Sequence, residues 1–192
     1  MINIDNKIDF FFENPNKWID NRVKFSNLYL LRRDISTCFG FDPTSGEKIK
    51  FNALWPGAMS ILAGIDLLSK YYYGKDDGGV GKRFKGYFDK YINEDDSKII
   101  YLFRNSLLHS FGLYSYELDK KTKKRIEFYF KTGHGEKLVS KNNKNLYLID
   151  IYILWQEFEK SIDLYLNDLK KSDDLKKKFN KIFPYYSTTN IN

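Results

Sequence analysis

The chain has 192 residues, which fits one domain and leaves no room for two ordinary domains with a linker. Hydrophobic residues make up 42% of the chain and aromatic residues 18%, which excludes a disordered protein and provides the material for a sizeable core. Because Cys38 is the single cysteine, an intramolecular disulfide and a multi-cysteine metal site are both excluded, and a reducing compartment is favoured.

Net charge and hydropathy indicate which classes of partner the protein can bind. The 32 Lys and Arg residues outnumber the 25 Asp and Glu residues, and the formal net charge of +7 attracts polyanions such as RNA or DNA. A biased codon pool explains the same excess, so the net charge alone carries little weight. Residues 1–7 lack the features of a secretory signal, and the longest apolar stretch, 53–68, is broken by proline, glycine and aspartate. We therefore expect a cytoplasmic protein with no membrane partner.

The first half of the chain has the periodicity of helices. Asn16 is a suitable N-cap for a first helix and Gly40 a suitable stop. Pro56 suits the first turn of a second helix, which Gly74 ends. Asp95 or Asp96 caps a later one. We expect helices over residues 16–38, 54–73, 80–92 and 95–112, with a loop at 41–52 and a turn at 75–79.

The second half of the chain has a different pattern. Alternating segments rich in aromatic residues predict a β-hairpin after the fourth helix. The link between its strands is longer than a tight turn. We expect strands at 114–118, 126–130 and 146–148, then helices over 150–169 and over the basic segment 172–183, which Pro184 closes. The sequence thus predicts a single all-α domain over 1–192, a helical bundle with a small hairpin insertion at about 114–148.

One segment points to chemistry. Arg104, Asn105 and His109 lie in an otherwise apolar helix, and the four-residue spacing puts Asn105 and His109 on one face, with the long side chain of Arg104 beside them. RNA cleavage by 2′-hydroxyl attack needs such groups, because a histidine moves the proton and an arginine fork holds the phosphate. From spacing alone, a polar cluster that bridges helices is the favoured alternative.

This segment resembles the motif of the HEPN superfamily, which is an arginine, a polar residue that is often asparagine, three further residues and a histidine, near the end of a core helix. Arg104, Asn105 and His109 fill these positions, and the resemblance is most specific over about residues 53–112. It implies a helical bundle that forms a homodimer and brings two copies of the motif to one cleft. The hairpin departs from a plain bundle and leaves the subfamily unidentified.

Many HEPN proteins are endoribonucleases in toxin, defence or RNA-processing systems and need no metal or other cofactor. The resemblance therefore implies an RNA substrate cut to a 2′,3′-cyclic phosphate, with His109 as acid and base, Arg104 as phosphate clamp and Asn105 as positioner. A cognate inhibitor protein of unknown identity belongs to the same expectation. Other members are inactive or only bind nucleotides, so a silent RNA-binding or dimerisation module stays open.

Several charged residues are candidates to support such a site. Asp66 lies among apolar residues of the second helix, where a carboxylate needs a partner, and Arg104 or His109 is the natural one. An ordinary boundary salt bridge explains Asp66 equally well. The glycine-rich segment 78–83 lacks the spacing of a phosphate-binding loop. The candidate RNA contacts are Lys82, Arg83, Lys120, Lys121, Lys123, Lys124 and Arg125, although a plain turn and a solvated loop are the favoured alternatives for these two groups.

Overall fold

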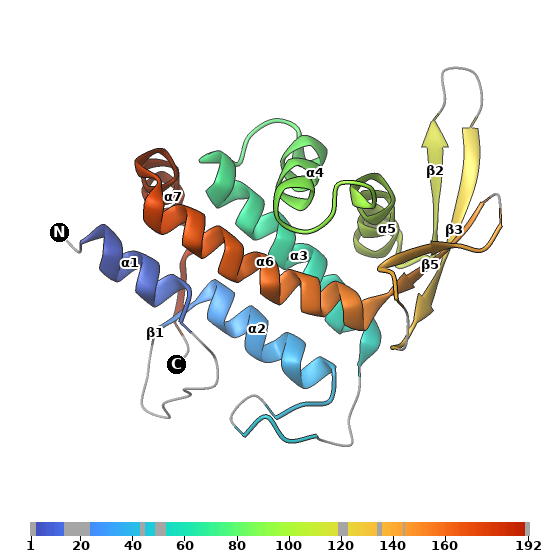
Figure 1. Ribbon diagram of the computed structural model, residues 1–192, viewed down its shortest axis with the longest axis horizontal. Helices are drawn as coiled ribbons and strands as arrows, with labels where there is room; N and C mark the ends of the chain where they lie inside the picture. The colour runs from blue at the N-terminus through green and yellow to red at the C-terminus, as the bar shows by residue number, and fades with distance from the viewer. Residues whose placement is uncertain are drawn as a thin grey trace.

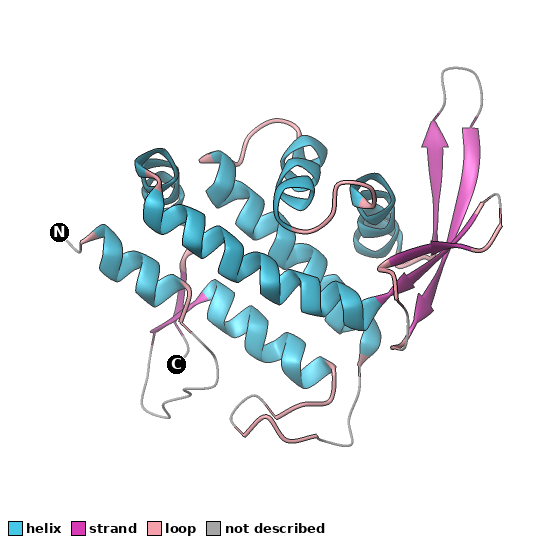
Figure 2. Ribbon diagram, viewed as in Figure 1, coloured by secondary structure: helices cyan, strands magenta, loops and turns pink. Residues whose placement is uncertain are grey.

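The computed structural model describes residues 3–13, 24–42, 45–48, 53–118, 123–133, 136–143 and 145–190. Helices dominate these residues (Figures 1 and 2). They are α1 (Ile4–Phe11), α2 (Asn27–Cys38), α3 (Leu54–Tyr73), α4 (Val80–Tyr91), α5 (Ser97–Ser110), α6 (Ile151–Lys171) and α7 (Asp173–Tyr186). The mainly helical class expected from the sequence is confirmed, and none of the helices in the described residues is long and apolar enough to cross a membrane.

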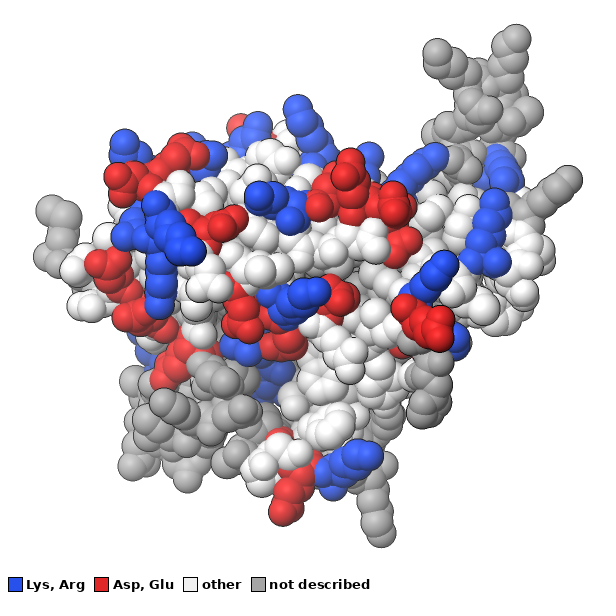
Figure 3. All heavy atoms as spheres, viewed as in Figure 1, with Lys and Arg blue, Asp and Glu red and all other residues white. Residues whose placement is uncertain are grey.

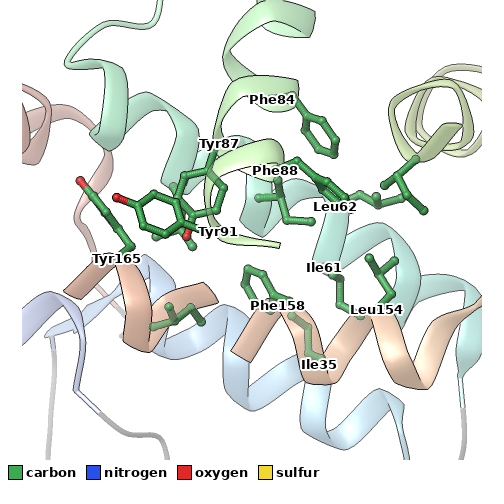
Figure 4. Close-up of a cluster of buried hydrophobic side chains, with 14 of the residues drawn as sticks. Ile35, Ile61, Leu62, Phe84, Tyr87, Phe88, Tyr91, Leu154, Phe158 and Tyr165 are labelled. Atoms are coloured by element: carbon green, nitrogen blue, oxygen red, sulfur yellow. The ribbon is translucent and has the colours of Figure 1, made fainter. Parts of the chain in front are cut away.

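The core lies where α2, α3, α4 and α6 meet (Figure 4). Ile61 and Leu62 of α3, Phe88 of α4 and Phe158 of α6 are all fully buried there. A Cβ atom on Gly64 would come within 2.6 Å of the Phe158 ring, so the absence of a side chain is what lets α3 approach α6 this closely. α3 is therefore the central element of the bundle and a rigid support for whatever it carries.

The boundaries of α3 follow from its sequence. Pro56 lies in the first turn, where its missing N–H costs no helical hydrogen bond. Gly74 adopts the left-handed conformation (φ 66°) and donates its backbone N–H to the carbonyl of Lys70, which ends the helix as expected. The helix expected over residues 80–92 is α4, and the helix expected over 150–169 is α6. The N-cap of α6 is Asp150, whose side chain accepts hydrogen bonds from two backbone N–H groups.

Two helix boundaries differ from expectation. The first predicted helix begins at Asn27, not at Asn16, because Ser26 caps it and residues 24–26 form the strand β1 (Lys24–Ser26); positions 14–23 lie outside the described residues. β1 pairs with β6 (Thr188–Asn190) near the C-terminus. Pro184 lies inside α7 and does not close it. The helix continues to Tyr186, whose carbonyl accepts a hydrogen bond from the Asn27 side chain at 2.8 Å.

The expected hairpin is part of a larger sheet. Strands β2 (Tyr114–Leu118) and β3 (Lys123–Lys131) pair antiparallel as predicted, but β4 (Val139–Lys141) and β5 (Leu146–Asp150) extend the sheet in the order β2-β3-β5-β4. β3 and β5 run parallel over five residue pairs, so the insertion is a four-stranded mixed sheet and larger than the small hairpin that the sequence predicted. A parallel pair leaves no turn signature in the sequence, because its strands are joined by a crossover.

The sheet lies at one end of the molecule beside α5 (Figure 1). Its inner face is apolar: the ring centroids of Phe103 and Phe128 lie 5.4 Å apart, and those of Trp55 and Phe130 lie 5.2 Å apart. The sheet is therefore joined to the helical core, and β2, its outermost strand on this side, runs close to the C-terminal half of α5.

Candidate functional site

Of the motif residues on α5, Arg104 is buried against the core, Asn105 is half-buried and His109 is exposed. Ile100, Phe103 and Leu107 are fully buried and hold the helix in place. Arg104 follows Phe103 directly, so its side chain starts at the edge of this apolar stripe, and only 9% of the residue is exposed. A guanidinium this deeply buried requires acceptors inside the protein.

Arg104 finds these partners on two helices. Its Nη2 donates to Oδ2 of Asp66 at 2.9 Å, which joins α5 to α3 across 38 positions of sequence. Its Nη1 donates to Oδ1 of Asn105 at 3.1 Å and lies 3.2 Å from Nε2 of His109. The guanidinium of Arg104 thus contacts the other three residues expected to form the site. The partner of Asp66 is Arg104.

The contact between Arg104 and His109 depends on the tautomer of the imidazole. Arg104 has only donors, so Nη1 donates to Nε2 of His109 only when that nitrogen carries a lone pair and the ring proton is on Nδ1. In that tautomer, the arginine occupies the lone pair that a general base needs.

Two polar atoms of the cluster have no hydrogen-bond partner in the described part of the chain. Oδ1 of Asp66 and Nε of Arg104 are both buried and unsatisfied. Such atoms are costly to bury, and networks that leave them open occur at functional sites. The cluster is therefore not a fully saturated structural ion pair.

An open hollow of about 410 Å³ lies against this cluster. Asn105 and His109 contribute its helical side and β2 the opposite side. Its lining consists of Tyr101, Asn105, Ser106, His109, Tyr114, Ser115 and Tyr116. The hollow gives a ligand access to the imidazole, whereas Arg104, with a side chain that is 11% exposed, does not line it.

The predicted RNA contacts differ in their exposure to solvent. Arg83 is 2% exposed, and its Nη1 donates to the backbone carbonyls of Asp77 (2.9 Å) and Gly78 (3.3 Å). Arg83 therefore holds the 75–79 turn and does not lie on the candidate RNA surface, whereas Lys82, in the first turn of α4, is exposed.

The lysine-rich link of the hairpin is only partly described. Lys120 and Lys121 lie outside the described residues, and Lys123 is described in its backbone alone. Lys124 is half-buried. Arg125 is exposed, forms an ion pair with Glu127 (3.2 Å) and lies over the ring of Tyr114, 4.8 Å from its centroid. Of this group, Arg125 is the residue that the structure places beside the hollow.

The sequence did not single out the tyrosines of the hollow as site residues. The available signal was the alternation in β2, which puts Tyr114 and Tyr116 on one face of the strand. Tyr101 carried no signal of its own, because a tyrosine on a helix that borders a core is most often a packing residue.

The net charge of the chain does not by itself mark a binding surface. Over the helical face in view in Figure 3, basic and acidic side chains lie interspersed.

No group of three or more His, Cys, Asp or Glu residues suited to a metal ion occurs in the described ranges. Comparison of the chain with family models, curated proteins and solved structures gave no match. The residues of the site are therefore the basis for any function of this protein.

Proposed function

We propose that this protein is a metal-independent endoribonuclease that cleaves RNA by 2′-hydroxyl attack. The observation that carries the proposal is the guanidinium of Arg104, held by Asp66 and in contact with Asn105 and His109 at the wall of an open hollow. The resemblance of this segment to the HEPN motif points to the same reaction. A toxin, defence or RNA-processing role belongs to that resemblance.

The reaction needs a base, an acid and a cation. His109 takes the proton of the ribose 2′-hydroxyl, O2′ forms a bond to phosphorus, and the P–O5′ bond breaks. The products are a 2′,3′-cyclic phosphate and a 5′-hydroxyl end, whose oxygen takes up a proton. Arg104 stabilises the charge that develops on the non-bridging oxygens. In the homodimer that we propose, His109 of the second copy supplies the proton of the leaving group.

The contacts suggest how the site becomes active. Where Nε2 of His109 carries the lone pair, Nη1 of Arg104 lies 3.2 Å from it and must move away before the imidazole accepts a proton from a substrate. An RNA phosphate competes for Nη1 as a stronger, charged acceptor. Asp66 keeps Nη2 in place at 2.9 Å during this exchange, and a short rotation of the guanidinium then frees Nε2. In this mechanism Asp66 is a positioning residue.

The test is incubation of the purified protein with mixed RNA in excess EDTA. Wild-type cleavage is expected to continue, with cyclic phosphate at the new 3′ ends. His109→Ala should lose about 10²–10⁴-fold in rate, the usual range for one positioned acid or base. Arg104→Lys should also be severely impaired, because lysine presents no planar fork. Arg32→Lys is the matched control, since Arg32 forms an ion pair of 2.7 Å with Glu159 away from the hollow. Cleavage that survives His109→Ala, or stops in EDTA, rejects the mechanism.

A second candidate is a catalytically silent RNA-binding or dimerisation module. The burial of Arg104 and its contacts within the protein favour this reading, since they also describe a cluster that only fixes the packing of α3 and α5. The module then shows no wild-type cleavage to lose, and Arg104→Lys lowers the melting temperature without any other effect.

A further inference from the structure

The outermost strand of the sheet presents two tyrosines to solvent. Tyr114 and Tyr116 alternate along β2, and 42% and 41% of their surfaces are exposed. Their ring centroids lie 6.1 Å apart, with the ring planes at 84°. Their partner strand β3 instead directs Ile126 and Phe128 into the core. In the register of β2 and β3, Tyr114 and Tyr116 lie opposite Glu127 and Arg125, so their side chains share the outer face of the sheet and not the inner face of Ile126 and Phe128.

These rings adjoin the catalytic candidates. Tyr114 and Tyr116 line the same hollow as Asn105 and His109, and Tyr101 of α5 completes it. A nucleotide whose phosphate or ribose lies at His109 therefore has its base, or that of its neighbour, within reach of an aromatic surface. Bases stack on tyrosine rings whatever their sequence, because every base has a π-face.

Charge favours a polyanion at this hollow. None of its lining residues is acidic. Two cations flank it: the guanidinium carbon of Arg125 lies 4.8 Å from the centroid of Tyr114, and Nζ of Lys85 lies 5.9 Å from that of Tyr101. Arg125 also forms an ion pair with Glu127 at 3.2 Å, which offsets part of its charge. A larger hollow of about 550 Å³ is more acidic, since four carboxylates, Asp95, Asp96, Glu136 and Glu157, contribute to its wall against two lysines, Lys137 and Lys160. The tyrosine-lined hollow is thus the better match for a phosphate chain.

We infer that Tyr114 and Tyr116 form a stacking platform for unpaired bases, which makes single-stranded RNA the substrate class of this site. A base in a duplex is already stacked and paired, so it reaches the rings only if it leaves the helix. The inference rests on the proposed ribonuclease function for the position of the scissile phosphate, and on the geometry of β2 for the base.

Binding is the readout that separates this inference from the proposed catalysis. The probe is a fluorescently labelled single-stranded oligonucleotide made with 2′-O-methyl ribose, which has no attacking hydroxyl, and the competitor is the same strand in a duplex. Fluorescence anisotropy measures the dissociation constant for the wild type and variants. Tyr114→Leu and Tyr116→Leu are each expected to weaken binding roughly 5- to 150-fold, the range for one base–aromatic stack. Tyr114→Phe and Tyr116→Phe keep the ring and should bind as the wild type does.

The control is Tyr185→Leu. Tyr185 is 77% exposed and belongs to α7, a helix that lies away from the sheet (Figure 1). This substitution should leave binding unchanged. Leucine variants of β2 that bind as tightly as the wild type, equal binding of the duplex, or no binding by the wild type each overturn the inference. If ring-dependent binding occurs but natural RNA stays intact, the platform stands and the ribonuclease proposal fails. Circular dichroism confirms that each variant is folded.

Discussion

The link between α3 and α5 makes a quantitative prediction. Replacing Asp66 with alanine removes the acceptor of Arg104 Nη2, and the Arg104 side chain is only 11% exposed. Water therefore cannot readily replace the lost carboxylate. A hydrogen bond between charged groups contributes about 1.5–3 kcal/mol, and stranding a buried partner adds to the loss, so we expect Asp66→Ala to cost about 2–4 kcal/mol of unfolding free energy. For a chain of this size, that corresponds to a fall in melting temperature of roughly 4–16 °C.

A double-mutant cycle isolates the interaction itself. Arg104→Met removes the cation and keeps a long apolar side chain, and the double variant strands neither charge. Urea denaturation of the four proteins should therefore give a coupling free energy of about 1.5–3 kcal/mol between Asp66 and Arg104. The loss of the contacts to Asn105 and His109 is common to both arginine variants and cancels in the cycle.

A second ion pair in the same protein serves as the reference. Arg32 donates from Nε and Nη2 to one oxygen of Glu159 at 2.9 and 2.7 Å, but the Glu159 side chain is 31% exposed, against 18% for Asp66. Solvent screening should hold that coupling to about 1 kcal/mol or less. Equal coupling in the two pairs, or coupling below about 0.5 kcal/mol for Asp66 and Arg104, would refute the view that burial makes this contact special.

Three further predictions follow from other parts of the molecule. Gly64→Ala places a Cβ atom 2.6 Å from Phe158 and 2.7 Å from Leu31, so urea denaturation should show a loss of about 1–3 kcal/mol, and unchanged stability contradicts the packing. Burial, followed by the charge of Asp95, raises the pKa of Asp96, so ionisation destabilises the folded state as pH rises above the ordinary value of 3.8. Asp96→Asn should therefore raise the melting temperature at neutral pH and leave it unchanged at pH values well below 3.8; a lower melting temperature at neutral pH contradicts this sign. Light scattering at tens of micromolar protein, on the order of weak-dimer affinities, should show a homodimer; a monomer alone opposes the proposed assembly through α5.

Local signals in the sequence determined most of the helical part of the fold. The limits of α3 follow from Pro56 in the first turn and Gly74 at the end, and the start of α6 from Asp150, because capping depends on residues a few positions apart. The same locality predicted that Asn105 and His109 share a face of α5 with Arg104 beside them. A four-residue spacing fixes this relation whatever surrounds the helix.

The sheet depended on information that no short segment holds. The alternation that predicted β2 and β3 is a local property, but the parallel pairing of β3 with β5 joins strands whose register is set by the packing of their inner faces against α5. The strand β1 was missed for the same reason. Three residues have too little pattern of their own, and their partner β6 lies at the other end of the chain.

The same distinction between local sequence and tertiary packing applies to the candidate site. The sequence determined which chemical groups α5 offers, and it supplied Asp66 as a carboxylate in need of a partner. Only the tertiary structure decided that this partner is Arg104, that Arg83 turns inward to hold its own loop, and that the tyrosines of β2 line the same hollow as His109. Each of these depends on which elements pack side by side. A buried charge shows that a partner is needed, but the direction in which its side chain finds one is set by the neighbouring helix or strand.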